Sequence, residues 1–500
     1  MNKETKIAIE RFREMIKEKK LIDSSLEILQ WDMETTAPKK GRELLSEMIG
    51  YLSMKGYDIV TSEKFVKLVQ TLKENEGFLD DIQRKEIEDM AEEIEKISKI
   101  PPHEYQAYSE LAAKTQGVWE EAKAAGDFSI FKENLKKIFE YNIKFAQYQG
   151  KKDKKIYDII LDEYEKGMNT EKLDKFFGEL RKEIVPLLKK IIEKSKGEDF
   201  EILHKKIDIA EQKKFNRFLG EYLGFDFDRG ITAESEHPFT LNLDKNDVRL
   251  TTKYIEDLPF SAVFSTIHET GHGIYEQQIG DDLQGTTLAT GGSMGLHESQ
   301  SRFYENIIGR SLPFWKGIYN RGVEFVKDID INELYRAVNK VEPSFIRTEA
   351  DELTYSLHIM IRYEIEKGII NGELSIDELP QIWNKKMEEY LGVVPSNDSE
   401  GVLQDVHWAC GLIGYFPSYA LGNVYAAQLY HKMKEDMDVD ALLEAGKLDR
   451  IKGWLRDRIH IYGKLRETNE LIIEITGEEL EPKYYIDYLK EKYSKIYNLD

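Results

Sequence analysis

The chain has 500 residues, enough to bury a large hydrophobic core, and its length alone would allow two or three domains. Its formal net charge of -22 argues against nucleic acid as a partner, because phosphate binding needs basic patches. The single cysteine, Cys410, excludes an internal disulfide and is typical of a reducing compartment, so we expect a cytoplasmic protein. The lysine- and glutamate-rich balance also fits a heat-adapted, thermostable protein.

No export or membrane signal is recognisable. The first twenty residues form a charged amphipathic pattern without the apolar run of a signal peptide. The longest apolar stretch, 408–424, is broken by three glycines and a proline and is too short to cross a bilayer. We therefore expect no membrane partner.

The first 230 residues read as a succession of helices joined by short connections. Twelve prolines in the whole chain, 33% charged residues and long 3.6-residue periodicity predict a mainly α protein. The predicted helices span 4–19, 24–31, 40–60, 62–75, 80–100 and 103 to beyond Gly126.

A β-hairpin is predicted over residues 237–254. Apolar and polar residues alternate on both sides of a turn at 244–246. Because the hairpin ends just before the next helix, its edge could pair with an extended peptide backbone. A purely structural hairpin is equally compatible with the sequence.

The following helix, residues 259–280, carries the motif His-Glu-x-x-His as His268, Glu269 and His272. Residues four apart share one face of a helix, so both imidazoles can bind one metal while Glu269 lies beside it. Two neutral imidazoles without thiolates suit zinc or a similar divalent ion, and they require a further ligand. This is the chemistry of a hydrolase.

Local features support that helix. Pro259 is tolerated in the first turn, and we expect Asp257 to cap the start. Gly271 and Gly273 do not suit an ordinary surface helix, because each costs about 1 kcal/mol relative to alanine. A close neighbour, the segment that brings the third ligand, would explain them.

Glu298 is the expected third ligand. It follows His272 by 26 residues, far enough for a second helix to return to the metal. Arg302, one turn later, could orient Glu298 or form an ordinary surface pair. His297 should point about 100° away from Glu298 and is the weaker ligand candidate.

Two later segments contain further candidates. Residues 345–368 are predicted as one long helix, on which Arg347 and Asp351 would form a simple ion pair. Residues 401–428 place His407 in a loop and Tyr419 in apolar surroundings. Buried tyrosines usually pack with satisfied hydroxyls, but a His and a Tyr here could also donate to an oxyanion. Residues 431–500 return to charged helices.

Six ordered motifs resemble the carboxypeptidase Taq family of metallocarboxypeptidases, densely over residues 237 to about 428. They are His237-Pro238-Phe239, Asp247-Val248-Arg249-Leu250-Thr251, His268-Glu269-Thr270-Gly271-His272, His297-Glu298-Ser299-Gln300, Ile346-Arg347-Thr348-Glu349-Ala350-Asp351 and Gly401-Val402-Leu403-Gln404-Asp405-Val406-His407-Trp408. Trp31-Asp32 to Gly41 also resembles a family segment, although Met33 and Ala37 depart from its pattern.

The resemblance implies a single large helical subunit with a deep central groove, a small β-sheet beside the metal and a homodimeric assembly. It implies zinc or, in some members, cobalt, and broad removal of single residues from peptides with a free C-terminal carboxylate. It places the metal ligands at His268, His272 and Glu298 and the general base at Glu269. The remaining expected site residues are Arg347 for the substrate carboxylate, with Arg249 as the second candidate for that role, His237 as a further substrate contact, and His407 and Tyr419 as oxyanion or substrate contacts.

Three regions are expected within one integrated domain: helices 1–235 along the groove wall, a metal-binding core at 236–430 and C-terminal helices at 431–500. Two alternatives to a carboxypeptidase remain from the residues. One is a helical oligopeptidase or dipeptidyl carboxypeptidase with the same metal motif. The other is a catalytically silent binding protein with a relic metal site.

Overall fold

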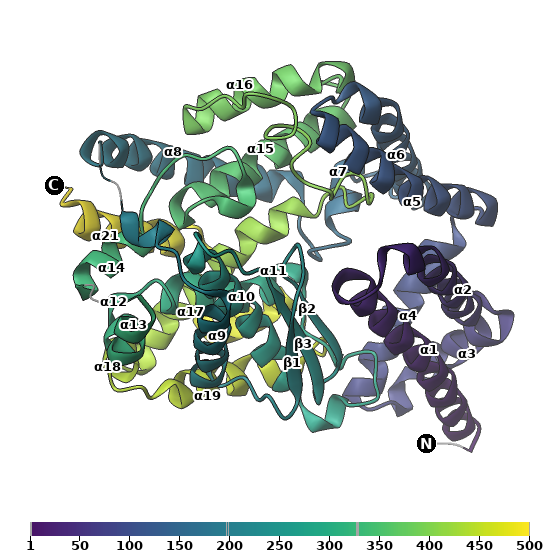
Figure 1. Ribbon diagram of the computed structural model, residues 1–500. Coiled ribbons are helices and arrows are strands. Elements are labelled where there is room, and N and C mark those ends of the chain that lie inside the picture. Colours follow the sequence, from purple (N-terminus) through teal and green to yellow (C-terminus); the bar gives the residue numbers. More distant parts are fainter. Residues whose placement is uncertain (1–2, 197, 199, 327–329, 500) are drawn as a thin grey trace.

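Helices with one apolar face make up most of the chain, as the composition predicts. The computed structural model describes residues 3–196, 198, 200–326 and 330–499 (Figure 1). The amino-terminal helices are α1 Lys3–Thr35, α2 Arg42–Thr61, α3 Glu63–Glu74, α4 Asp81–Ser98, α5 Pro102–Ala125, α6 Ser129–Tyr148, α7 Ile156–Leu161, α8 Thr170–Lys194 and α9 Ile209–Leu223.

The helices after the sheet complete the subunit. They are α10 Pro259–Gln277, α11 Met294–Arg302, α12 Leu312–Gly317, α13 Tyr319–Val326, α14 Ile331–Val338, α15 Glu352–Ile370, α16 Leu379–Leu391, α17 Phe416–Asp436, α18 Val439–Glu444, α19 Leu448–Arg458, α20 Thr468–Thr476 and α21 Lys483–Tyr497. No helix among the described residues is long and apolar enough to cross a membrane.

Helix α1 is continuous, so the predicted break between residues 19 and 24 is wrong. Neither glycine nor proline occurs between residues 3 and 35, and nothing therefore ends the helix. Ser25 fits inside it because its hydroxyl donates to the Leu21 carbonyl, 2.7 Å away.

The sheet contains β1 Gly230–Glu234, β2 Thr240–Asp244 and β3 Asp247–Thr252 in the order β1-β3-β2. The antiparallel β2 and β3 confirm the predicted hairpin, and β1 adds a parallel partner for β3 that was not predicted. Strand β1 has only five residues, and its one large apolar side chain, Ile231, is exposed, so the strand carries only a weak signal in the sequence. Val248 and Leu250 of β3 are buried, and α10 packs directly against this strand.

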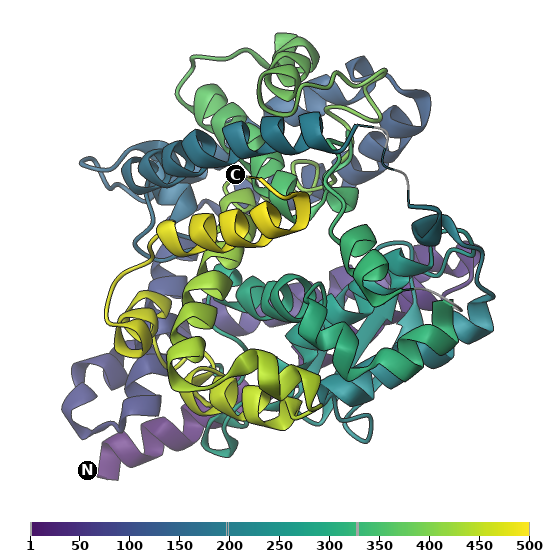
Figure 2. The ribbon, with the colours of Figure 1, turned by 90° about the vertical axis from the view of Figure 1, so that its left-hand side faces the viewer.

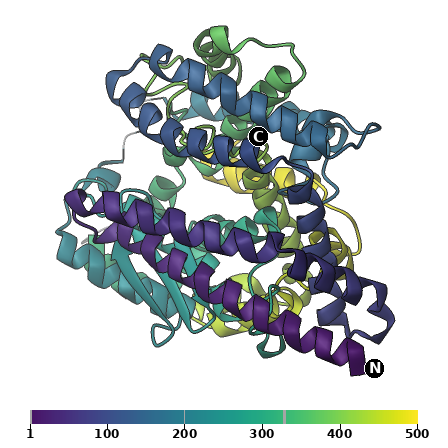
Figure 3. The ribbon, with the colours of Figure 1, turned by 90° about the vertical axis from the view of Figure 1, so that its right-hand side faces the viewer.

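One hydrophobic core extends from Trp119 to Tyr497, so the sheet, α10 and the C-terminal helices share it. Figure 2 shows α21 lying alongside α8, which binds the end of the chain to this core. Helices α1–α4 have a second apolar cluster. Figure 3 shows α1 and α2 side by side along one flank of the molecule. Trp31 of α1 packs edge-on against Phe239, next to β2, with 5.8 Å between ring centroids.

Candidate metal centre

Helix α10 begins at Pro259, where the missing N–H is harmless. Its cap position is occupied by Leu258, which provides no side-chain hydrogen bond, so the expected cap by Asp257 is wrong. A Cβ on Gly271 would lie 2.7 Å from the Gln300 carbonyl oxygen. Gly271 therefore permits the close approach of α11, the segment that carries Glu298, and the expected reason is confirmed for this glycine. For Gly273 the expected neighbour is wrong, because a Cβ there would lie 2.7 Å from the Phe225 ring and 3.0 Å from Leu250 of β3.

The structure brings His268, His272 and Glu298 together. One donor atom from each lies within 4.8 Å of the other two. Oε2 of Glu298 is 3.6 Å from Nε2 of His268 and 3.4 Å from Nε2 of His272. On the other side of Glu298, Gly422 of α17 leaves room for its side chain, because a Cβ there would lie 2.6 Å from Glu298 Cγ. Two imidazole nitrogens and one carboxylate oxygen are a donor set that suits a divalent metal with one open position.

Neighbouring side chains fix which ring nitrogens face this cluster. Nδ1 of His268 lies 2.9 Å from Glu305 Oε2. Because the carboxylate accepts this hydrogen bond, Nδ1 of His268 carries the proton, and Nε2 of His268 is left without one. His272 Nδ1 lies 2.6 Å from His297 Nδ1, while His297 Nε2 lies 2.7 Å from Glu276 Oε1. When Nε2 of His297 donates to Glu276, Nδ1 of His297 carries no proton and accepts a hydrogen bond from Nδ1 of His272. Nε2 of His272 then also carries no proton and can bind a metal.

Glu298 is held ionised by its surroundings. Burial alone would raise its pKa, but Arg302 and His268 outweigh burial and hold the pKa well below its ordinary value. The Arg302 Nε donates to Glu298 Oε1 at 2.7 Å, and both side chains are mostly buried. Arg302 therefore orients Glu298, and the alternative of an ordinary surface pair is excluded. Burial also lowers the pKa of His272 to about 3, so its imidazole is neutral as a metal ligand must be.

Glu269 lies in a buried position beside the cluster, only 6% exposed. Its Oε2 accepts a 2.6 Å hydrogen bond from the hydroxyl of Thr240 on β2. Burial raises the pKa of Glu269, against the weaker opposing effects of His268 and Thr240. Strand β2 thus orients the carboxylate of Glu269, which is not one of the three clustered donors.

Arg347 does not form the predicted pair with Asp351. Helix α15 begins at Glu352, and Asp351 caps it by accepting from two backbone N–H groups, so the single helix expected from residue 345 is wrong. Arg347 instead donates from Nε and Nη2 to Asp405 Oδ1, at 3.0 and 2.8 Å. Its Nη1 donates to the Tyr355 hydroxyl at 2.9 Å.

His407 and Tyr419 lie beside Arg347. Nε2 of His407 is 3.0 Å from the Tyr419 hydroxyl, and the Arg347 guanidinium lies 4.9 Å from the centre of the Tyr419 ring. Burial lowers the pKa of His407 to about 3 and raises that of Tyr419 well above its ordinary value, so both are neutral. Tyr355 connects Arg347 to the metal-binding candidates. Its hydroxyl accepts from Arg347, and its ring packs 4.0 Å from the guanidinium of Arg302, which binds Glu298.

Arg249 and His237 lie apart from the three clustered donors and from Arg347. Arg249 pairs across the hairpin with Leu241, one position from Thr240, and so projects from the face of the sheet opposite Glu269. There it forms a bidentate ion pair with Asp247. His237 is exposed before β2. Among the described residues, neither side chain has a hydrogen bond or ion pair with the clustered histidines or Glu298.

Two residues of the centre were missed from the sequence. Glu276 lies four residues after His272, and Glu305 lies seven after Glu298, so both follow the helical spacing of residues already identified. A search for carboxylates one or two turns from each proposed ligand would have found them.

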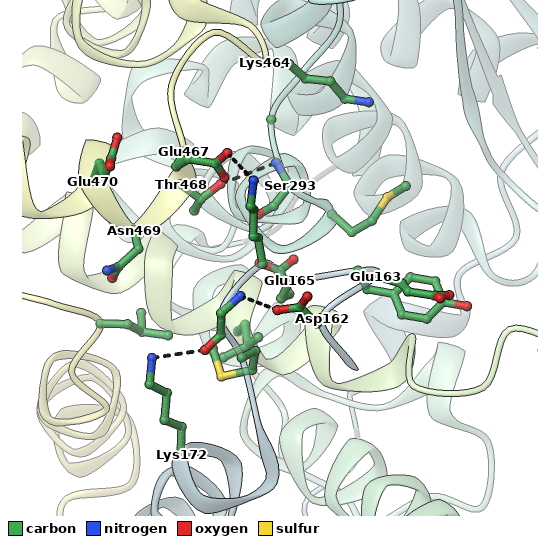
Figure 4. A pocket seen from close by; sticks show the side chains of 18 of the residues that line it. Asp162, Glu163, Glu165, Lys172, Ser293, Lys464, Glu467, Thr468, Asn469 and Glu470 are labelled. Atoms are coloured by element: carbon green, nitrogen blue, oxygen red, sulfur yellow. Dashed lines mark hydrogen bonds and ion pairs between the residues drawn. The ribbon is translucent and has the colours of Figure 1, made fainter. Parts of the chain in front are cut away.

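A cavity of about 1260 Å³ lies between the amino-terminal helices and the core (Figure 4). Ion pairs such as Lys166 with Glu467 cross its wall, and buried Glu165 accepts from the Gly295 N–H at the start of α11. The clustered histidines and Glu298 do not line it. Tyr164 connects the two regions, because it lines the cavity and contacts Tyr415, which in turn contacts Tyr419.

A His-Glu-x-x-His helix with a third carboxylate from an adjacent helix, in a mainly helical subunit, defines a metallopeptidase. Residues 11–493 match the family described as Carboxypeptidase Taq (M32) metallopeptidase. The chain therefore belongs to the carboxypeptidase Taq family of metallopeptidases.

Individual relatives agree with this assignment. Carboxypeptidase 1 of Bacillus subtilis is 45% identical over 494 residues, covering 98% of each chain. Thermostable carboxypeptidase 1 of Pyrococcus furiosus is 38% identical, covering 93% of this chain and 94% of the relative. A solved Pyrococcus furiosus carboxypeptidase superposes with a TM-score of 0.94 at 36% identity and 99% coverage of each chain. A Deinococcus radiodurans carboxypeptidase gives 0.95 at 32% identity, covering 99% of this chain and 100% of that one. The chain is thus a metallocarboxypeptidase, an enzyme that acts on peptides with a divalent metal.

Proposed function

We propose that this enzyme releases single C-terminal amino acids from peptides with broad specificity. In this proposal His268, His272 and Glu298 bind one zinc ion or, alternatively, cobalt. The observation that carries it is the convergence of those three donors beside the carboxylate of Glu269. When bound, the metal polarises the scissile carbonyl and acidifies a water molecule.

Glu269 is the general base of the proposed reaction. It accepts a proton from the attacking water, whose oxygen bonds to the carbonyl carbon, and then donates the proton to the amine as the C–N bond breaks. The pKa of Glu269, raised by burial, suits proton exchange near neutral pH better than that of an exposed carboxylate. Thr240 orients the carboxylate through its hydrogen bond to Oε2.

Arg347 is the proposed binder of the substrate's C-terminal carboxylate. Arg347 and Arg362 share the single carboxylate of Asp405, so this buried group retains a net positive charge. Arg347 has five N–H donors, and the described contacts use three of them, which leaves donors for a substrate. Its link to the cluster through Tyr355 supports a role near the reacting bond.

The other proposed contacts have weaker support. Neutral His407 and Tyr419 can donate hydrogen bonds to the substrate or to an oxyanion, as their position beside Arg347 suggests. Arg249 and His237 stay predictions as substrate contacts. The placement of Arg249 across the sheet favours Arg347 for the carboxylate.

Product analysis on a short peptide with zinc or cobalt supplied tests this function. We expect single residues to appear one after another from the C-terminus. Dipeptides or internal cuts would instead indicate a dipeptidyl carboxypeptidase or an oligopeptidase. A protein that releases no product, either as purified or after zinc or cobalt is supplied, would be the silent binding protein.

Arg347→Lys tests the carboxylate contact separately. Lysine keeps the charge but loses the planar fork, so kcat/KM for peptides with a free carboxylate should fall about tenfold or more. An exposed Arg456→Lys variant is the control. Amidated peptides should be affected much less, and an equal loss on both substrates would contradict the assignment.

We also propose that the enzyme is a cytoplasmic homodimer. Exposed apolar side chains on α1 and α2, such as Leu21, Leu44 and Tyr51, each more than 60% exposed, support an assembly surface on this flank. Light scattering after size-exclusion chromatography should give twice the 58.3 kDa subunit mass, and the triple variant to glutamate should give the monomer. A monomeric wild type would contradict the dimer.

A further inference from the structure

Arg362, in the middle of α15, lies behind Arg347 on the side away from solvent. Its side chain is 0% exposed, whereas that of Arg347 is 7% exposed, so Arg362 is out of reach of a substrate. Its guanidinium packs 4.6 Å from the centre of the Trp383 ring on α16. A fully buried charge is costly unless it is paired and hydrogen-bonded, so the partners of Arg362 indicate what it does.

Arg362 and Arg347 bind the same two side chains, Gln404 and Asp405. Arg362 donates from Nε to Asp405 Oδ2 and from Nη2 to Gln404 Oε1, both at 2.7 Å. Arg347 donates from Nε and Nη2 to the other oxygen of Asp405, Oδ1. The backbone N–H of Arg347 donates to the same Gln404 Oε1 at 2.8 Å. These two acceptors therefore connect Arg362 to both the side chain and the backbone of Arg347.

The loop that carries the two acceptors is held from other sides as well. Gln404 Nε2 donates to the carbonyls of Phe345 and Glu400, at 2.9 and 3.0 Å, so its Oε1 faces the arginines. Lys123 Nζ donates to the backbone carbonyl of Gln404 at 2.9 Å. A displacement of Arg347 would therefore break contacts with a loop that is fixed on several sides.

The charges of this group are unequal. Among the described residues, Asp405 is the only carboxylate paired with either arginine. His358 and His407 are neutral, because burial, together with the two arginines, lowers the pKa of both. Two positive charges thus share one negative charge. If Arg362 were neutral, Asp405 would balance the charge of Arg347 alone and would compete with a substrate carboxylate for it.

We propose that Arg362 is a positioning residue for recognition of the substrate's C-terminal carboxylate. It takes up the charge of Asp405 and holds Gln404 in place, so that Arg347 stays oriented and its positive charge remains available to the substrate. Arg362 itself does not touch the peptide. This inference rests on the proposed role of Arg347 as the carboxylate binder.

Arg362→Met tests this assignment, because methionine retains a long apolar side chain beside Trp383 and removes the charge. The probes are two versions of one non-hydrolysable peptide analogue, with a free or an amidated C-terminus, measured as competitive inhibitors. We expect the Ki of the free-carboxylate version to rise about tenfold and that of the amidated version to stay within about twofold. The kcat on a short peptide should fall by less than about threefold, because Arg362 acts on binding. An unchanged Ki for the free carboxylate, or an equal rise for both versions, would overturn the proposal.

The double variant Arg362→Met/Asp405→Asn separates charge from packing. It removes the negative charge of Asp405 together with the positive charge of Arg362, so Arg347 again carries an uncompensated charge. Asparagine can still accept from Arg347 through Oδ1. The Ki of the free-carboxylate version should return to within about threefold of the wild type. A double variant as impaired as Arg362→Met would show that the charge of Arg362 has no part in carboxylate binding.

Arg13→Met is the matched control. Arg13 of α1 also pairs with a fully buried carboxylate, that of Glu86 on α4, at 2.5 Å. Both helices belong to the separate apolar cluster of the amino-terminal region. The control loses an ion pair of the same kind, yet both Ki values should stay within about twofold of the wild type. A shift like that of Arg362→Met would show that any such loss changes carboxylate binding, against the proposal.

Two further variants keep the proposal testable if Arg362→Met does not fold. Arg362→Gln loses the charge but can still donate to Asp405, and it should weaken the free-carboxylate version as Arg362→Met does. Arg362→Lys keeps the charge and should weaken that version less than the glutamine variant. Equal Ki values for the lysine and glutamine variants would overturn the role of the charge.

Failure of the proposed function is distinguishable from failure of this inference. If Arg347→Lys weakens both versions of the analogue equally, Arg347 does not bind the carboxylate, and the proposed contact itself is wrong. If Arg347→Lys weakens mainly the free-carboxylate version and Arg362→Met weakens neither, only the role of Arg362 is wrong.

Discussion

At the scale of single residues, the proposed general base is Glu269. Glu269→Gln keeps the size of the side chain and its contact with Thr240 but cannot accept a proton. We expect kcat to fall about 10²–10⁴-fold, the range of general acid–base catalysis. Metal content, measured by emission spectrometry, should stay at one ion per subunit, because Glu269 is not a proposed ligand. A variant that keeps more than a tenth of wild-type kcat would contradict the general-base role.

The residues behind the proposed ligands should control metal affinity. Glu276→Gln replaces the acceptor at His297 by an amide, so the proton arrangement that leaves His272 Nε2 free is no longer enforced. We expect the Kd for zinc to rise about 10–100-fold in competition with a chromogenic chelator. The exposed Glu373→Gln is the control, and its affinity should be unchanged. Equal affinities for both variants would show that this contact does not tune the metal site.

At the scale of elements, the contact between α10 and α11 sets the position of Glu298. In Gly271→Ala the new Cβ would lie 2.7 Å from the Gln300 carbonyl oxygen and 2.8 Å from Ser301 Cα. Both are backbone atoms, so α11 must move away from α10. We expect a loss of stability of about 1–3 kcal/mol from overpacking, together with weaker zinc binding because Glu298 moves with α11.

Gly178→Ala is the matched control for that substitution. Gly178 lies within α8, and a Cβ there would meet no atom within 4 Å. The change should be neutral or stabilising by up to about 1 kcal/mol because alanine favours the helix. Thermal unfolding and chelator competition on both variants decide the question. If Gly271→Ala were as stable as Gly178→Ala and bound zinc with the same affinity, the close contact between α10 and α11 would not determine the position of Glu298.

Local patterns predicted the parts of the site that lie on single elements. Apolar periodicity and the four-residue spacing of His268 and His272 located α10, and the distance to Glu298 allowed a returning helix. The hairpin followed from its alternation. In contrast, Arg347 finds its partner 58 residues away in Asp405, and no local signal connects them. Helical spacing instead suggested Asp351, which caps α15. Long-range pairing of this kind is decided by packing, which sequence spacing does not contain.

At the scale of the whole molecule, Asp405 joins three parts of the chain. It accepts from Arg347, ahead of α15, and from Arg362 within α15, while it lies itself in the loop before α17. Burial alone would raise the pKa of Asp405, but the two arginines outweigh it and hold the pKa far below its ordinary value. A carboxylate with a depressed folded-state pKa stabilises the fold above its unfolded pKa of about 3.9. That stabilisation is lost as the pH falls towards the folded-state value.

Asp405→Asn should therefore destabilise the subunit in a pH-dependent way. Removing one partner of a buried ion cluster leaves charge uncompensated and costs about 3–5 kcal/mol, so Tm at pH 7 should fall by several degrees. The difference in Tm from the wild type should narrow as the pH is lowered below about 3.9. Asp377→Asn is the control, because Asp377 also accepts from two lysines but lies exposed at the surface, where such pairs contribute little. Its Tm should match the wild type at pH 7. If the Tm of Asp405→Asn at pH 7 also matched that of the wild type, the ion pairs of Asp405 with the two arginines would not stabilise the fold.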